Sequence, residues 1–254
     1  MRTSLIAAAL AALAASLCLA SEWKEQPPRD TNAPPAKAPQ TARPAQERHL
    51  PSAAESNTLE HVFSAIDRTA AHFHSFKAAF KQFDTDPIFQ EENESSGVFH
   101  FRKVGGDGDG AATFQLRFDY VTPEPSTFII NGSKIIQYDP TMKAPQESLL
   151  VDNVKLDAML AGFTSTKRMR EHYDVMLDKA ARDSVTLFMM PKKTVVDKNF
   201  RELRVTFSRG AWLPVKIDQL KLNGQRITFT FDTPEVNRTL PDKLFTREGI
   251  AVAK

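Results

Sequence analysis

The sequence predicts a mainly β, α+β fold: a single curved antiparallel sheet of about ten to eleven strands forming an incomplete β-barrel, with an N-terminal helix and short lid helices over an apolar cavity. In most of the chain after residue 76, apolar and polar residues alternate with a period of two, which is typical of half-buried antiparallel strands. Turn residues separate these segments. Helical spacing occurs in only two places, which excludes a doubly wound α/β fold.

The first twenty residues have the pattern of a secretory signal peptide. Arg2 precedes an uncharged, alanine-rich run over residues 5–20, which is short for a membrane span of roughly 20 residues. Cys18 and Ala20 are small residues at −3 and −1, so we expect cleavage after Ala20 and a periplasmic protein; an uncleaved anchor is the alternative. Leu17 replaces the small residue that precedes a lipidated cysteine, so a lipid-anchored chain is not expected.

Residues 21–56 are predicted to be a proline-rich disordered linker. They hold seven of the chain's 16 prolines and almost no large apolar residue. Such a segment cannot bury enough surface to offset its conformational entropy. It serves either as a tether or as an inert leader, and the folded domain is expected over residues 57–250.

The domain is expected to begin with an amphipathic helix over residues 58–76, where apolar residues recur every three or four positions. Helical spacing returns at residues 148–172, which ends in a polar stretch over 164–170 and is expected to supply the lid. Period-two segments predict strands, in chain order, at 76–80, 97–101, 114–120, 127–130, 134–138, 173–177, 184–190, 200–207, 212–220 and 225–231.

Three turn signals join these strands. The glycine-rich run 105–110 is expected to be a solvated hairpin loop, because no helix or Lys-Ser/Thr pair follows it as in a phosphate-binding loop. Asn131-Gly132 predicts a type I′ hairpin, and Asn223-Gly224 predicts a further turn.

The composition excludes several classes of function. A formal net charge of +2 gives no strong field for nucleic acid, and the single cysteine excludes a disulfide framework and a two-cysteine metal or redox motif. His72 and His74 lie two residues apart, and none of the six histidines has the spacing of a metal site or a catalytic triad. With no nucleophile motif or dinucleotide loop either, we expect no enzyme, no cofactor and no metal.

Phenylalanine is over-represented, with 18 residues against 3 tyrosines and 2 tryptophans, and it falls on one face of successive strands. An ordinary sandwich core is one interpretation. The other is an apolar cavity, because a single large sheet with few helices has more apolar face than its cover can fill.

Several motifs, in their order and spacing, resemble the LolA family, the periplasmic carriers of outer-membrane lipoproteins. The resemblance covers roughly residues 57–246 and rests on these motifs: Ser-Phe-Lys-Ala-Ala-Phe-Lys-Gln at 75–82, Gln-Leu-Arg-Phe-Asp-Tyr at 115–120, Pro123, Asn131-Gly132, Ile-Gln-Tyr-Asp-Pro at 136–140, Phe-Met-Met-Pro at 188–191, the strand 200–207 and Gly224-Gln225. It implies an incomplete barrel around an apolar cavity with helices that open to admit acyl chains.

Strand parity and the resemblance together assign the cavity side chains. On the concave face we expect Phe99, Phe101, Leu116, Phe118, Tyr120, Ile136, Tyr138, Phe207, Ile217, Phe229 and Phe231, with Met159, Leu160 and Phe163 facing them from the lid. The family's arginine that latches the lid corresponds to Lys103, with Arg102 beside it. A lysine keeps the charge but loses the planar fork of the guanidinium.

The resemblance implies a monomeric carrier that ferries lipoproteins from inner-membrane release machinery toward an outer-membrane acceptor. The alternative is a lipid-binding or lipoprotein-sensing regulatory module of the same fold that binds a membrane-protein partner. Such a sensor would be expected to carry a second domain. An outer-membrane receptor of similar fold would need a lipidated cysteine, against which Leu17 argues.

Overall fold

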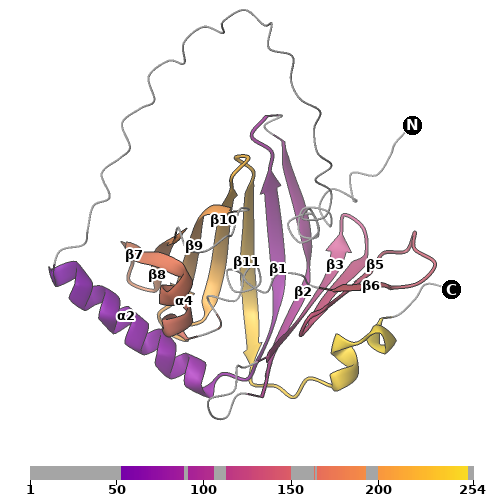
Figure 1. Ribbon diagram of the computed structural model, residues 1–254, viewed down its shortest axis with the longest axis horizontal. Helices are drawn as coiled ribbons and strands as arrows, with labels where there is room; N and C mark the ends of the chain where they lie inside the picture. The colour runs from indigo at the N-terminus through magenta and orange to yellow at the C-terminus, as the bar shows by residue number, and fades with distance from the viewer. Residues whose placement is uncertain are drawn as a thin grey trace, which may run out of the picture.

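The computed structural model describes residues 53–88, 91–105, 113–149, 163, 165–192 and 200–250. Within these ranges one sheet of eleven strands carries two α-helices and two short 3-10 helices (Figure 1). The elements in chain order are α2 (Ala53–His72), β1 (Ser75–Thr85), β2 (Glu92–Val104), β3 (Thr113–Thr122), β4 (Ser126–Asn131), β5 (Lys134–Tyr138), β6 (Gln146–Leu149), α4 (Thr166–His172), β7 (Tyr173–Ala180), β8 (Ser184–Pro191), β9 (Phe200–Ser208), β10 (Pro214–Lys221), β11 (Arg226–Val236), η1 (Asp242–Phe245) and η2 (Arg247–Gly249).

The sheet is antiparallel and open. Its strand order is β6-β5-β4-β3-β2-β1-β11-β10-β9-β8-β7, so each strand pairs with its neighbour in sequence except where β1 pairs with β11. That pairing joins two meanders, β1 to β6 and β7 to β11, into one curved surface. β6 and β7 end the order at opposite edges and do not pair with each other. The predicted fold class, an incomplete antiparallel barrel with few helices, is confirmed.

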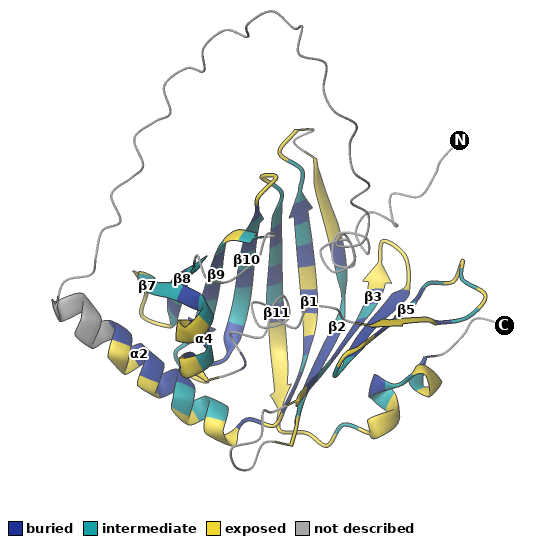
Figure 2. Cartoon of the chain, in the orientation of Figure 1, coloured by how far each residue is buried: buried dark blue, intermediate teal, exposed yellow. Residues whose placement is uncertain are grey.

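The two faces of the sheet have different covers. We call the face that packs against α2 the inner face. Its large apolar cluster joins alternate residues of the strands to Leu59, Val62, Phe63 and Ile66 of α2. Figure 2 shows this pattern as buried and exposed sides along α2 and as buried bands on the strands. One side of the helix therefore completes the inner core, as its apolar spacing predicts.

The opposite, outer face is covered over β3 to β5 by the C-terminal segment, residues 238–250. Phe245 and Ile250 of this segment pack in a second, smaller cluster with Ile129, Ile136 and Tyr138. In Figure 1 the segment (yellow) lies beside the β3–β6 half of the sheet, whereas α2 (indigo) and α4 lie beside the other half. The sheet thus has one apolar layer on each side.

Helix α2 ends earlier than its apolar spacing predicts, at His72 and not at residue 76. The side chain of Asn237 stops it: its Nδ2 donates to the carbonyl of His72 (2.9 Å) and its Oδ1 accepts from the amide of His74 (2.8 Å). Asn237 itself has a positive φ of 56°, which asparagine tolerates better than most residues. A residue far along the chain therefore sets the helix boundary, and Ser75 already belongs to β1.

The helical segment predicted over residues 148–172 is wrong at its start and confirmed at its end. Residues 146–149 form the edge strand β6, which pairs with β5 through Lys134 and Leu149. The predicted polar end of the segment is where the helix forms, because α4 spans Thr166–His172. Its position is set by Asp67 of α2, whose carboxylate accepts from the amide (2.7 Å) and hydroxyl (2.6 Å) of Thr166.

The β4–β5 hairpin differs from the predicted type I′ turn. Asn131 pairs with Lys134 as the last residue of its strand, so the two loop residues are Gly132 and Ser133. Gly132 has φ of +60°, and Ser133 is not among the positive-φ residues, whereas type I′ needs a positive φ at both positions. A positive φ at the first loop position alone, filled here by glycine, is typical of a type II′ turn.

Some predictions fall outside the described residues. These are the signal peptide over 1–20, most of the linker over 21–56 and most of the glycine loop over 105–110. Helix α2 begins at Ala53, inside the predicted linker, so the described fold starts earlier than residue 57.

Candidate functional site

The inner face is lined by aromatic rings from adjacent strands. Phe99 on β2 lies opposite Phe118 on β3, with ring centroids 4.6 Å apart, and Phe76 on β1 lies 5.8 Å from Phe231 on β11. These residues alternate with polar ones, so the two-residue period of a strand places all the rings on one face. Each is 8% exposed or less. The result is a continuous aromatic surface across the four central strands.

Phe163 covers this surface from the side of α2 and α4. Its ring centroid lies 5.0 Å from that of Phe101, 5.1 Å from Phe76 and 5.8 Å from Phe99. It also lies 5.9 Å from Phe73, at the end of α2. Phe163 belongs to none of the described helices or strands, yet it is only 4% exposed. Phe163 therefore packs over the centre of the aromatic surface.

The other end of the inner face, toward the β1–β2 and β10–β11 hairpins, is polar. Tyr120 donates its hydroxyl to Gln82 Oε1 (2.7 Å), and burial raises the pKa of that phenol. Gln225 donates to Asp84 Oδ1 (2.7 Å) and accepts from Lys221 Nζ (3.0 Å). Burial lowers the pKa of Lys221, an effect that Asp84 opposes. The apolar surface is thus bounded at this end by buried hydrogen bonds.

A pocket of about 410 Å³ lies where α2 and α4 meet the ends of β2 and β3. It opens beside Phe163, so it adjoins the aromatic surface. Its lining residues are Asp67, Ala70, Ala71, Lys103, Phe114, Phe163, Ser165, Lys167 and Arg168. The pocket therefore combines apolar walls with three cationic side chains.

The described residues hold no group of three or more His, Cys, Asp or Glu side chains that could bind a metal ion. Among them, too, no helix has the length and apolar character needed to cross a membrane.

The family comparison matches this architecture. The family described as outer membrane lipoprotein carrier protein LolA matches residues 71–248, which is most of the chain and nearly all of the described fold. The chain belongs to the LolA family. No curated protein sequence matches it significantly.

Solved structures of similar fold come from several bacteria. The Pseudomonas aeruginosa MucA/MucB complex has a chain 16% identical (76% of this chain, 61% of that one, TM-score 0.41). A LolA superfamily protein of Nitrosomonas europaea is 12% identical (75% and 98%, TM-score 0.37), and the Mycobacterium tuberculosis lipoprotein LppX is 11% identical (72% and 98%, TM-score 0.39). The chain thus spans less than two thirds of the matched chain in the MucA/MucB complex.

Most of the cavity residues predicted for this LolA-family chain lie together in the inner cluster. Those that do are Phe99, Phe101, Leu116, Phe118, Tyr120, Phe163, Phe207, Ile217, Phe229 and Phe231. Met159 and Leu160 lie outside the described residues. The placement of Ile136 and Tyr138 on this face is wrong: both pack in the outer cluster against Phe245. Their neighbour Ile135 is the β5 residue that points inward.

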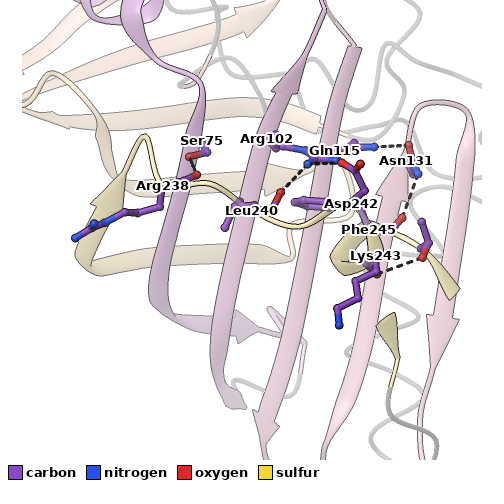
Figure 3. Close-up of polar contacts among 10 residues, drawn as sticks. Ser75, Arg102, Gln115, Asn131, Arg238, Leu240, Asp242, Lys243 and Phe245 are labelled. Atoms are coloured by element: carbon purple, nitrogen blue, oxygen red, sulfur yellow. Dashed lines mark hydrogen bonds and ion pairs between the residues drawn. The ribbon is translucent and has the colours of Figure 1, made fainter. Parts of the chain in front are cut away.

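The two predicted latch residues separate. Lys103 lines the inner pocket, whereas Arg102 points to the outer face and holds the C-terminal segment (Figure 3). Arg102 donates through Nη1 to the carbonyl of Leu240 (2.7 Å) and pairs with Asp242 (2.8 Å), while its Nε donates to Gln115 Oε1 (2.8 Å). Adjacent strand residues face opposite sides, so Arg102 cannot reach the lid side, and this part of the latch prediction is corrected.

The outer-face contacts of the C-terminal segment continue along β3 and β4. Arg117 donates through Nη1 to the carbonyls of Leu244 (2.8 Å) and Gly249 (3.1 Å), and its Nε pairs with Asp119 (2.7 Å). Asn131 Nδ2 donates to the carbonyl of Phe245 (3.1 Å). On β1, the hydroxyl of Ser75 donates to the carbonyl of Arg238 (2.6 Å). Side chains of four strands, β1 to β4, therefore hydrogen-bond the carbonyls of the C-terminal segment.

Sequence reasoning missed several inner-face residues. Phe76 and Phe80 were recognised as strand residues, and their parity alone would have added them to the aromatic surface. No sequence pattern indicated Lys167 and Arg168, because they lie in a polar stretch. The hydrogen bond between Asp67 and Thr166, at the start of α4, brings them to the pocket beside the end of β2.

Proposed function

We propose that this LolA-family chain is a carrier that holds the acyl chains of lipoproteins on its inner face during transit between membranes. The observation that carries the proposal is the aromatic surface of β1, β2, β3 and β11, over whose centre the ring of Phe163 packs 5.0–5.8 Å from those of Phe76, Phe99 and Phe101. An acyl chain that enters from the pocket would replace Phe163 over the same rings. Membership of the LolA family supports this use of the surface.

The energies favour such an exchange. Transfer of an acyl chain with about 15 methylenes from water to an apolar site is favourable by about 12 kcal/mol, at about 0.8 kcal/mol for each methylene. Exposing one buried phenylalanine costs about 1.5–3 kcal/mol. Loading can therefore displace Phe163 and still leave a large net gain. The carrier needs no covalent chemistry for this step, which fits the proposal that it is not an enzyme.

We place this activity in the periplasm, in keeping with the predicted signal peptide over residues 1–20 and with the family description. A carrier of this kind receives its cargo from inner-membrane release machinery and delivers it to an outer-membrane acceptor. Residues 21–52 would then act as the linker before the domain, which begins with α2 at Ala53.

The proposal is tested with the exported full chain and a triacylated lipopeptide carrying a fluorophore. We expect saturable binding at one lipopeptide per chain and no binding of the same peptide without acyl groups. Mass spectrometry of organic extracts of the protein purified from its own periplasm then identifies the natural cargo. Equal binding of the acylated and unacylated peptides would contradict an acyl-chain carrier.

A further inference from the structure

The pocket beside Phe163 has apolar walls on one side. Ala70 and Ala71 of α2 form part of its lining, together with the rings of Phe114 and Phe163. Phe101 connects these rings to the aromatic surface, because its centroid lies 5.6 Å from that of Phe114 and 5.0 Å from that of Phe163. A ligand in this pocket can therefore extend a chain from it onto the inner face.

The charges that line the pocket are mainly positive. Lys103 comes from the end of β2, and Lys167 and Arg168 come from α4. Arg168 also lies over the ring of Phe114, with its guanidinium carbon 5.9 Å from the ring centroid. The single lining carboxylate, that of Asp67, is engaged by both the amide and the hydroxyl of Thr166. The pocket therefore presents cations beside an apolar wall.

Three lysines on the strands have glutamate partners that the two pocket lysines lack. Lys77, Lys81 and Lys134 each pair with a glutamate at 2.8–3.0 Å. Within the described ranges, neither Lys103 nor Lys167 has a carboxylate within ion-pair distance. Among the described lining residues the one carboxylate, that of Asp67, is hydrogen-bonded to Thr166, so Lys103 and Lys167 can attract an anionic ligand. An ammonium group binds a phosphate as a compact point charge.

We propose that this pocket binds the phosphate of an anionic phospholipid, whose acyl chains lie on the aromatic surface of the inner face. The inference rests on the proposed acyl-chain carrier function and specifies the headgroup that the carrier selects. A phosphodiester headgroup supplies a negative charge for Lys103 and Lys167, and the acyl chains of the lipid supply the apolar surface that the phenylalanine rings contact. The anchor of a lipoprotein has acyl chains but no phosphate, so the pocket adds a lipid class to the cargo.

The test compares two lipids with the same acyl chains and a fluorophore on one of them: anionic dioleoylphosphatidylglycerol and uncharged dioleoylglycerol, which lacks the phosphate. We expect the full chain to bind the anionic lipid roughly tenfold more tightly, as charge-assisted hydrogen bonds to phosphate predict. The double variant Lys103→Gln/Lys167→Gln should lose this preference and keep its affinity for dioleoylglycerol.

The matched control is Lys81→Gln/Lys134→Gln, which removes the same charge from exposed strand positions away from the pocket. It should keep the preference, and thermal melting should show both double variants folded. A preference that survives in the pocket variant, or is lost equally in the control, would overturn the inference.

Two further outcomes separate the sources of failure. Equal binding of the two lipids by the unaltered chain would overturn the headgroup inference and leave the carrier function intact. Failure to bind either lipid would overturn both. Millimolar inorganic phosphate is added as a competitor, and complete displacement of the anionic lipid by phosphate alone would overturn the lipid assignment in favour of a free-anion site.

Discussion

Arg102 and Lys103 are neighbours on β2, yet their side chains lie on opposite faces of the sheet. Arg102 binds the carbonyl of Leu240 in the C-terminal segment, whereas Lys103 lines the pocket under α2. The alternation of a β-strand requires this separation. The two cations therefore have different expected roles, one in holding the C-terminal segment and one at the ligand pocket.

The first prediction concerns the C-terminal segment. Arg102→Leu removes charge-assisted hydrogen bonds on a side chain that is 18% exposed, and should lower the free energy of unfolding by about 1.5–3 kcal/mol. Hydrogen exchange should show faster exchange in residues 240–250, with acyl-chain binding unchanged. Arg238→Leu, on a side chain that is 73% exposed, is the control and should have almost no effect. Tighter lipid retention by Arg102→Leu is the result expected of a lid latch and would contradict this assignment.

The second prediction compares Phe163, which an acyl chain would displace, with Phe118, which belongs to the core. Phe118 is fully buried on β3, so Phe118→Ala should cost about 3–5 kcal/mol of stability, as large core truncations do. Phe163→Ala should cost less and should raise the affinity for a fluorescent fatty acid by roughly tenfold, because the ligand no longer displaces a ring. Urea unfolding and fluorescence titration measure the two effects. Weaker fatty-acid binding by Phe163→Ala would show that Phe163 is part of the binding surface.

The third prediction tests the close approach of β2 and β3. A Cβ at Gly97 would lie 1.9 Å from the carbonyl oxygen of Asp119, so the two backbones must separate if alanine is introduced. Gly97→Ala should lower stability by at least about 1–3 kcal/mol, the usual cost of overpacking, as measured by thermal melting. Gly210→Ala is the matched control, because its nearest contact would be 3.7 Å from Ser208 Oγ. Equal melting temperatures for the two variants would contradict this geometry.

The fourth prediction concerns pH. His100 is buried on the outer face, where its Nδ1 lies 3.8 Å from Oδ2 of Asp119. Burial lowers the pKa of His100 below the ordinary 6.5, although the carboxylate of Asp119 opposes this effect. The charges of Arg117 and Lys77 lower the pKa further, whereas that of Glu235 raises it. The unfolded chain then takes up the proton before the folded chain does. Stability present above pH 6.5 is therefore lost as the pH falls toward the lowered value.

His100→Gln should reduce this loss between pH 7.5 and pH 5, measured as the change in the free energy of urea unfolding. His61→Gln, at an exposed position on α2, serves as the control and should retain the full loss. An unchanged pH dependence in His100→Gln would assign the loss to other groups.

The sequence predicted the open antiparallel sheet and most of the inner face, because period-two alternation reports directly which residues share a face. It misassigned Ile136 because Ile135 and Ile136 are both buried on β5, one on each face. Alternation cannot choose between two adjacent isoleucines when a cover hides the outer face. That cover is Phe245 and Ile250, more than a hundred residues along the chain.

The pocket could not be predicted for a similar reason. Lys103 was singled out only through the family resemblance, and its partners in the lining come from α2 and α4. The contact between Asp67 and Thr166 that brings α4 to this place joins residues 99 positions apart. The local spacing of residues shows which face of a strand each side chain lies on, but it gives no information on a contact between distant segments.

The most direct test of the central claim is photocrosslinking of the full chain with a fatty acid that bears a diazirine near its methyl end, followed by mass spectrometric mapping. The account predicts crosslinks on the inner face, at residues such as Phe99, Phe118 and Phe229, and their disappearance with excess unlabelled lipopeptide. Crosslinks confined to the outer cluster around Phe245, or none that the lipopeptide displaces, would contradict it.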